Sequence, residues 1–312
     1  MGKYIGKRLL MMIPVILGIS FLIFAIMNLT PGDPARLILG EYAPQEQVDL
    51  LREEMGLNDN FFVRYGRYIV DALSGDFGES YRTGQSVAVE IAARFPTTVK
   101  LASGAITLSI LIGIPVGIIS AVKQYSIIDG VSLISALLLT SMPNFWLGLM
   151  LLLLFSLKLG WFPTSGAGSM SAFVLPCITL AASTMAVLIR MTRSTMLEVI
   201  RQDYIRTAIA KGAKESRIIF KHALRNALLP VVTIIGINFG IQLGGSIVVE
   251  NVFGMPGLGS LIVESVKMKD TPMVMAGIMF IAVVGSLVNL GVDILYMYID
   301  PRIKSQYVRA KR

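Results

Sequence analysis

The stretch Leu101–Val122, LASGAITLSILIGIPVGIISAV, contains no Asp, Glu, Lys or Arg. Five further runs share this property and each exceeds 20 residues: Leu9–Gly32, Gly130–Leu157, Leu159–Ile189, Asn226–Val249 and Thr271–Val292. A helix needs about 20 apolar residues to cross a hydrocarbon core of ~30 Å, and a helix satisfies its own backbone hydrogen bonds there. The runs therefore predict an all-α integral membrane protein with six transmembrane helices.

The composition of the whole chain agrees with this class. Of 312 residues, 54% are hydrophobic and 15% are charged, whereas about a quarter are charged in a soluble domain. The net charge of +8 would fit a nucleic-acid binder, but the basic stretches lie beside long apolar runs, which disfavours that class. The single Cys177 and the single His222 exclude an intramolecular disulfide framework and a multi-histidine metal cluster.

Two of the runs need closer inspection. The first follows Lys3, Lys7 and Arg8 as a signal peptide would, but it is too long for a typical signal and lacks a small-x-small cleavage site. We expect it to be a retained helix. The fourth run opens with a turn-like segment, Gly160–Gly166, so its helix is expected to start near Phe173.

Charge asymmetry predicts the orientation. The N-terminus carries three basic residues, the loop Arg190–Arg225 carries nine basic and three acidic residues, and the tail from Asp300 carries five basic residues and one acidic residue. The segment Thr30–Pro96 instead carries six Arg and eleven acidic residues. Because basic loops stay in the cytoplasm, we expect both termini and the Arg190–Arg225 loop to be cytoplasmic.

The acidic segment after the first helix is expected to form a small helical cap. Pro44 can open a helix that places Val48, Leu51 and Met55 on one face and ends at Gly56. A second helix is predicted over Phe61–Leu73. A third is predicted over Val87–Phe95 and is expected to stop at Pro96.

The basic loop contains a short helical segment, DYIRTAIAKGAKE, over residues 203–215. Asp203 can cap this helix and Gly212 permits a sharp turn after it. The small side chains of Thr207, Ala208 and Ala210 allow a close approach by a partner. A loop that lies on lipid headgroups or one without a partner would also fit this composition. The fifth helix is expected to start at Pro230.

These residues resemble a known family, the permease subunits of dipeptide/oligopeptide/nickel importers of the ATP-binding cassette class. The stretch Asp203–Gly212, followed by His222–Pro230, matches that family's "EAA" coupling loop, with Arg206-Thr207-Ala208 in place of Glu-Ala-Ala, as is usual in the peptide branch. Further matches follow in order along the chain: Pro31–Pro34, Gly75–Ser80, Pro143–Gly148, Leu159–Pro163, Glu250–Gly259, Asn289-Leu290 with Asp293 and Tyr296, and Asp300–Arg302.

The resemblance implies a subunit that pairs with a second, homologous permease in a bacterial or archaeal cytoplasmic membrane. Two cytoplasmic ATPase subunits would bind the ATP and Mg²⁺, and an outward substrate-binding protein would deliver the cargo. This chain itself lacks a G-x-x-x-x-G-K-[ST] phosphate loop, so no cofactor, metal or catalytic residue is assigned to it. The residues implied for coupling to the ATPase are Asp203, Tyr204, Arg206, Thr207, Ala208, Ala210 and Gly212.

Polar and small residues inside the runs supply the remaining candidates. Those that can line a pathway, or instead bond neighbouring helices, are Ser141, Asn144, Asn238, Gln242 and Ser246. An outward docking loop would use Phe253, Pro256 and Gly257. Small-residue ridges, within the chain or toward a partner permease, are formed by Gly236, Gly240 and Gly244 and by Gly113 and Gly117. Asp293 would couple an ion gradient in the alternative function, a secondary transporter, or form an ion pair near the end of the last helix.

The expected organisation follows from these assignments. It comprises a cytoplasmic N-terminus (1–8), a first transmembrane helix (9–29), an outward helical segment (30–98) and a five-helix permease core (99–312) that includes the coupling loop (190–226) and a cytoplasmic tail (298–312).

Overall fold

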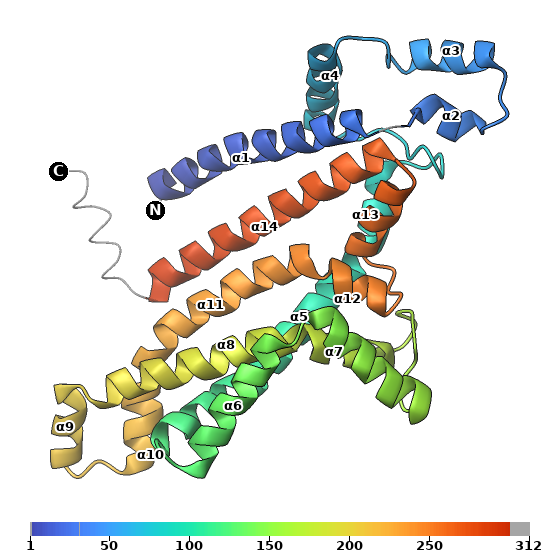
Figure 1. The fold of residues 1–312 in the computed structure, drawn as a ribbon. Helices are drawn as coiled ribbons and strands as arrows, with labels where there is room; N and C mark the ends of the chain where they lie inside the picture. Colours follow the sequence, from blue (N-terminus) through green and yellow to red (C-terminus); the bar gives the residue numbers. More distant parts are fainter. Residues whose placement is uncertain (1, 31, 300–312) are drawn as a thin grey trace. The chain divides into compact units, whose positions relative to one another are not determined.

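The computed structural model describes residues 2–30 and 32–299, and this part of the chain is helical apart from one isolated β-bridge between Glu79 and Ser86 (Figure 1). In chain order the α-helices are α1 (Gly2–Leu29), α2 (Pro34–Leu39), α3 (Gln45–Glu54), α4 (Phe61–Leu73), α5 (Val87–Val122), α6 (Ile127–Ser141), α7 (Asn144–Leu151), α8 (Val174–Ile200), α9 (Asp203–Ala210), α10 (Glu215–Arg217), α11 (Leu224–Gly245), α12 (Ile247–Val252), α13 (Leu258–Lys267) and α14 (Thr271–Ile299). Two π-helical segments, η1 (Leu152–Lys158) and η3 (Ile218–Ala223), and a 3₁₀ segment, η2 (Met170–Phe173), join them. The residues from Asp300 onward, where the predicted tail and its sequence matches lie, and Pro31 are outside the described residues.

The predicted membrane helices are present. Within the described residues, five helical stretches are long and apolar enough to cross a membrane: Ile5–Leu29, Val87–Val122, Met170–Ile200, Glu215–Gly244 and Thr271–Leu295. A sixth is obtained if the pair Ile127–Ser141 and Asn144–Lys158 counts as one span. The all-helical membrane fold is therefore confirmed, and the fourth predicted helix begins where expected, at η2 and α8.

The third predicted span is not one straight helix. Its two halves are bent by 101° at the break between Ser141 and Asn144. Pro143 has no N–H to donate and disfavours helical geometry at the preceding residue. Met142 is accordingly extended, with φ −82° and ψ 124°. The uncharged run Gly130–Leu157 gave no indication of this break, because its length and composition fit a single straight helix.

The described residues form two compact units. One comprises the described residues up to Thr98 with Pro256–Ser286, and the other comprises Val99–Met255 with the described residues from Leu287 onward. Both α5 and α14 begin in the first unit and end in the second. Residues 256–286 thus belong with the segment that follows α1.

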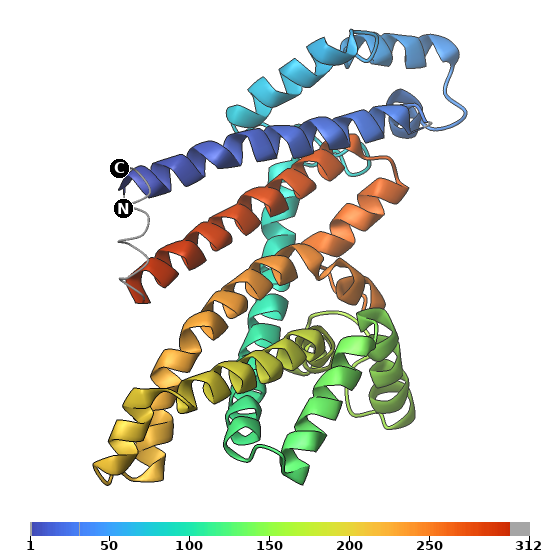
Figure 2. The ribbon, with the colours of Figure 1, turned by 60° about the vertical axis from the view of Figure 1, so that its left-hand side comes forward.

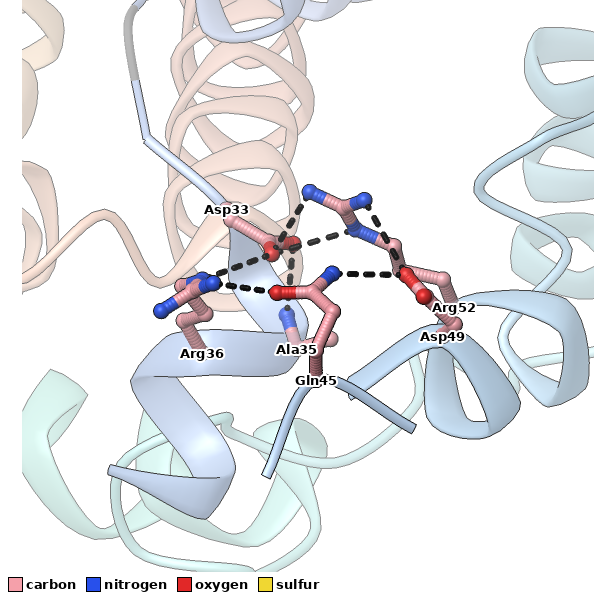
Figure 3. A network of polar contacts seen from close by, with 6 residues as sticks. All are labelled: Asp33, Ala35, Arg36, Gln45, Asp49 and Arg52. Atoms are coloured by element: carbon pink, nitrogen blue, oxygen red, sulfur yellow. Dashed lines mark hydrogen bonds and ion pairs between the residues drawn. The ribbon is translucent and has the colours of Figure 1, made fainter. Parts of the chain in front are cut away.

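In the first unit, polar contacts around Asp33 hold α2 against α3 (Figure 3). The Asp33 carboxylate caps α2 by accepting a hydrogen bond from the Ala35 N–H at 3.2 Å, and Arg52 Nη2 of α3 lies 2.8 Å from Asp33 Oδ2. Gln45 Nε2 donates to Asp49 Oδ1 at 2.9 Å beside them. The hydrogen bond to Asp33 raises the pKa of the Arg52 guanidinium above its ordinary value. The six members drawn are Asp33, Ala35, Arg36, Gln45, Asp49 and Arg52.

The cap predicted after the first helix is largely confirmed. Helix α3 follows Pro44, with Val48 buried, and α4 covers the predicted Phe61–Leu73. Aromatic side chains of α4, including Phe61 and Tyr65, pack against Phe24 of α1. The loop before α5 is fixed by the buried Asp270, which accepts a hydrogen bond from Ser80 Oγ at 2.5 Å.

The prediction that a helix stops at Pro96 is wrong. Helix α5 continues through Pro96 to Val122. A proline inside a helix removes one hydrogen bond, but buried side chains on both sides, Ile91 and Leu101, hold α5 in place. Packing outweighs the local signal of this proline.

In the second unit, glycines let helices approach closely. A Cβ added to Gly117 of α5 would lie 2.7 Å from Thr192 Cβ and 2.8 Å from the Ile189 carbonyl oxygen, both on α8. A Cβ on Gly113 would lie 3.0 Å from Leu188 Cβ. These small residues serve packing within the chain.

The fifth span also differs from its prediction. Pro230 lies inside α11 rather than at its start, because α10 and η3 lead into α11 without an interruption. The missing N–H removes only the bond to the Asn226 carbonyl, and prolines of this kind are tolerated in membrane helices. Gly236 of α11 packs closely on Val292 of α14, where an added Cβ would lie 2.1 Å from a Val292 methyl group.

Candidate functional site

Helix α9, Asp203–Ala210, is attached to the second unit by one buried side chain. Ile205 is fully buried in a cluster that otherwise consists of Ile118, Ala121, Met196, Ala223 and Ala227. The other residues of α9 are exposed except for the half-buried Ala208. Figures 1 and 2 show α9 and α10 at the same end of α8 and α11. Most of the surface of α9 is therefore free to contact another molecule.

Both ends of α9 are defined by backbone geometry. Gln202, not Asp203, is the extended N-cap residue, and no side chain caps the helix. Asp203 is the first helical residue, where its negative charge suits the helix dipole, and it lies 3.7 Å from Arg206. Gly212 ends the segment with φ +75° and donates its N–H to the Ile209 carbonyl at 2.9 Å. The predicted sharp turn at Gly212 is confirmed, whereas the predicted Asp203 cap is wrong.

A second contact ties α9 to α11. Asn226 Nδ2 donates to Tyr204 Oη at 2.8 Å. Ile205 and Asn226 position α9, although neither was predicted from the sequence to do so. The spacing of Ile205 and Ile209, four residues apart, was a signal that one face is apolar. Of these two residues, Ile205 is buried against the rest of the chain, whereas Ile209 is 57% exposed.

The surroundings of α9 are strongly basic. The exposed cationic side chains in the loop Arg190–Arg225 are Arg190, Arg201, Arg206, Lys211, Lys214, Arg217, Lys221 and Arg225. An exposed isoleucine surrounded by cations is suited to an apolar cleft with an acidic rim.

The structure brings two pathway candidates together on α11. Gln242 Nε2 donates to Thr184 Oγ1 of α8 at 2.9 Å, and Thr184 Oγ1 lies 3.4 Å from Asn238 Oδ1. Gln242 is buried, and its Oε1 has no hydrogen-bond partner among the described residues. These side chains join α8 and α11.

The other pathway candidates lie apart from this pair. Ser246 is buried and donates to Glu250 Oε1 at 2.8 Å. Ser141 is exposed at the end of α6 and donates to the Leu137 carbonyl, while Asn144 is half-buried at the start of α7. Ser141 and Asn144 flank the 101° bend.

The three docking-loop candidates have different environments. Phe253 is buried in the core formed with Leu101 and Leu180, and its carbonyl accepts a hydrogen bond from the Gly166 N–H at 3.2 Å. Gly257 is buried as the N-cap residue of α13, and Pro256 is exposed. Of the three, Pro256 alone has a side chain accessible to a partner.

Long apolar helices, polar side chains bonded between them and a short exposed helix in a basic loop are the features of a helical membrane protein that binds a partner. Comparison with known sequences identifies the type of membrane protein. Residues 113–305 match the family model "binding-protein-dependent transport system inner membrane component", and residues 1–102 match the N-terminal model of the same systems. The chain belongs to this family and is a multi-pass inner-membrane permease subunit of an ATP-binding cassette importer, without an ATPase domain. The ion-gradient-driven alternative is set aside.

Relatives match over almost the whole chain. The chain is 42% identical to the dipeptide transport system permease protein DppB of Alkalihalophilus pseudofirmus, covering 97% of this chain and 100% of that protein. It is 44% identical to the glutathione transport system permease protein GsiC of Escherichia coli K12, covering 97% and 99%.

Solved structures support the fold. An inward-facing MetNI methionine ABC transporter chain matches with a TM-score of 0.54 at 19% identity, covering 67% of this chain and 96% of that one. An amino acid ABC transporter crystallised with histidines matches with a TM-score of 0.51 at 18% identity.

Proposed function

We propose that this permease moves di- or oligopeptides, or glutathione-like cargo, and that α9 is its contact with an ATPase subunit. The cargo assignment rests on the two relatives above, whose names specify dipeptide and glutathione transport. Both compounds are small peptides with free carboxylate and ammonium groups, so one class of pathway serves either.

The observation that supports the role of α9 is its exposure. A buried Ile205 and the Tyr204–Asn226 hydrogen bond hold the helix, and its remaining surface makes few contacts with the chain. The contact surface would comprise Asp203, Tyr204, Arg206, Thr207, Ala208, Ala210 and Gly212. ATP and Mg²⁺ would be bound by two ATPase subunits, whose closure would push on α9.

The remaining partners follow from the family. A homologous second permease would complete the pathway, and an extracytoplasmic binding protein would deliver cargo to the opposite side, where Pro256 is exposed. Asn144 and Ser141 are the accessible pathway candidates, while Asn238, Gln242 and Ser246 would act through helix packing. The charge distribution supports cytoplasmic placement of both termini and of the α9 loop.

The test uses the full importer in proteoliposomes, with radiolabelled glycyl-leucine and radiolabelled glutathione as separate probes. Ala208→Trp places a large side chain on the half-buried contact face of α9, while Ala208→Ser is the matched small control. Ala208→Trp is expected to reduce ATP-dependent uptake by about tenfold, with Ala208→Ser close to the parent. Normal uptake by a properly assembled Ala208→Trp complex contradicts the coupling role, and uptake of neither probe by the parent contradicts the cargo class.

A further inference from the structure

A buried carboxylate joins three helices of the second unit. Asp129, near the start of α6, receives two hydrogen bonds from Arg193 of α8: Nε lies 2.6 Å from Oδ1 and Nη2 lies 2.8 Å from Oδ2. Ser120 of α5 donates to Oδ1 at 2.6 Å, and the Tyr125 N–H donates to Oδ2 at 2.9 Å. The side chains of Asp129 and Arg193 are only 4% and 18% exposed. We call Ser120, Asp129 and Arg193 the clamp.

The clamp closes a group of helices that is already tightly packed. Gly113 and Gly117 bring α5 onto α8 with no space for a Cβ, and Ala136 of α6 packs on Ala186 and Ile189 of α8. Bidentate arginine–carboxylate pairs fix distance and direction together. The three helices therefore have little freedom to slide or rotate against one another near the clamp.

The anchor of α9 uses the same helices at neighbouring turns. Ile118 and Ala121, which flank Ser120 on α5, contact the cluster that buries Ile205. Met196, three residues after Arg193 on α8, belongs to that cluster as well. Thus Ile205 of α9 lies in the same buried cluster as residues of α5 and α8 close to the clamp, together with Ala223 and Ala227.

The helix that the clamp adds, α6, leads to the bend before α7. Besides the clamp, α6 packs on α8 through small and apolar side chains, which allow sliding more readily than a bidentate ion pair does. We propose that the clamp is the positioning element that makes α5, α6 and α8 move as one body with α9, so that displacement of α9 reaches the bent α6–α7 pair. This inference rests on the proposed coupling role of α9.

A distance measurement in the assembled importer tests the proposal directly. Spin labels are placed at two exposed positions, Ile127→Cys on α6 and Ser216→Cys on α10, the short helix that follows α9, in a chain whose single cysteine is changed by Cys177→Ala. With the clamp intact, the distance between the labels is expected to change by less than about 2 Å, the size of ordinary helix shifts, between nucleotide-free and ATP-bound complexes. A larger change in the parent overturns the proposal.

Variants of the clamp provide the second measurement. Asp129→Asn, which keeps the side-chain shape, and Arg193→Met are expected to lower glycyl-leucine uptake per ATP hydrolysed by about tenfold and to broaden the label distance. The exchange Asp129→Arg with Arg193→Asp should recover part of that ratio, whereas the exposed-pair variant Arg67→Ala should leave it unchanged. If Asp129→Asn assembles and its uptake per ATP equals that of the parent, the clamp has no positioning role.

The two proposals fail in different ways. If Ala208→Trp leaves uptake normal, the contact role of α9 is wrong whatever the clamp variants do. If Ala208→Trp abolishes uptake while the clamp variants retain the parental ratio and label distance, α9 acts without the clamp. A merely structural role for the clamp would lower the amount of assembled complex without changing uptake per ATP.

Discussion

Two aspartates, Asp33 and Asp129, perform the same chemical task in different environments. Each accepts a hydrogen bond from a backbone N–H and pairs with an arginine from another helix. Asp33 and Arg52 are 15% and 37% exposed in side chain, whereas Asp129 and Arg193 are 4% and 18% exposed. Solvent therefore contacts the Asp33–Arg52 pair more than it contacts the Asp129–Arg193 pair.

This difference decides what each pair contributes. Water and salt screen the Asp33–Arg52 attraction, so its loss is partly compensated by hydration. A charge left behind at Asp129 or Arg193 has little water to replace its partner, so the cost of removing one side chain is large. The Asp33–Arg52 pair therefore contributes modestly to the free energy of unfolding, whereas removing one member of the Asp129–Arg193 pair costs much more.

The largest expected effect comes from breaking the buried pair. Arg193→Met leaves the Asp129 charge unpaired and should lower the free energy of unfolding by about 3–5 kcal/mol. Chemical unfolding of the full chain in detergent measures it, with Arg193→Lys as the control that keeps the positive charge. A loss below about 1 kcal/mol, the range of surface pairs, would show that water reaches Asp129.

The next effect tests the close packing beside the clamp. Gly117→Ala places a Cβ against Thr192 and the Ile189 carbonyl, and overpacking of this kind costs about 1–3 kcal/mol. Gly130→Ala on α6 is the matched control, because nothing lies within 4 Å of its added Cβ. In thermal unfolding, Gly117→Ala should have a lower melting temperature than Gly130→Ala. Equal melting temperatures would mean that α5 can move away from α8.

A smaller effect is expected at the partly exposed aspartate. Asp33→Ala removes the cap of α2 and the partner of Arg52, at a cost of about 1 kcal/mol. Asp33→Asn keeps the cap and removes the charge, so it should recover most of that loss. Unfolding at low and high salt is the measurement. The charge contribution, measured as the difference between the parent and Asp33→Asn, should shrink as salt rises, and a salt-independent difference would contradict the exposed character of the pair.

The smallest effect is expected for the exposed pair of Arg67 and Asp59, which are 52% and 43% exposed and 2.7 Å apart. Arg67→Ala should change the unfolding free energy by no more than about 0.5 kcal/mol. The same detergent assay applies, and Arg67→Lys is the control. A change as large as that of Arg193→Met would show that burial does not determine how much an ion pair contributes to the stability of this chain.

Much of the fold was predictable because uncharged length is a physical requirement of membrane helices. The boundaries Phe61–Leu73 were also readable, since Gly75 follows the helix. The errors at Pro96 and Pro230 have one cause: a proline's local preference was outweighed by packing or by the helix that precedes it. At Pro143 the local preference prevailed, and the sequence pattern did not distinguish this proline from the other two.

The candidate site was predictable to a lesser degree. Spacing and small residues selected α9, and the structure has a helix over Asp203–Ala210 followed by the turn at Gly212. The burial of Gln242 against Thr184 depends on which helix is the neighbour, and sequence spacing carries no such information. No role was predicted for Asp129, because its partner Arg193 is 64 residues distant in sequence.

That separation has a consequence for how the chain is made. Asp129 precedes Arg193 by 64 residues, so at ~5–20 residues per second the ribosome adds the arginine roughly 3–13 s after the aspartate. During that interval the carboxylate depends on donors synthesised at the same time, Ser120 and the Tyr125 N–H. The hairpin of α5 and α6 thus supplies hydrogen bonds to Asp129 before α8 is synthesised. Synthesis of α8 then adds the two hydrogen bonds from Arg193.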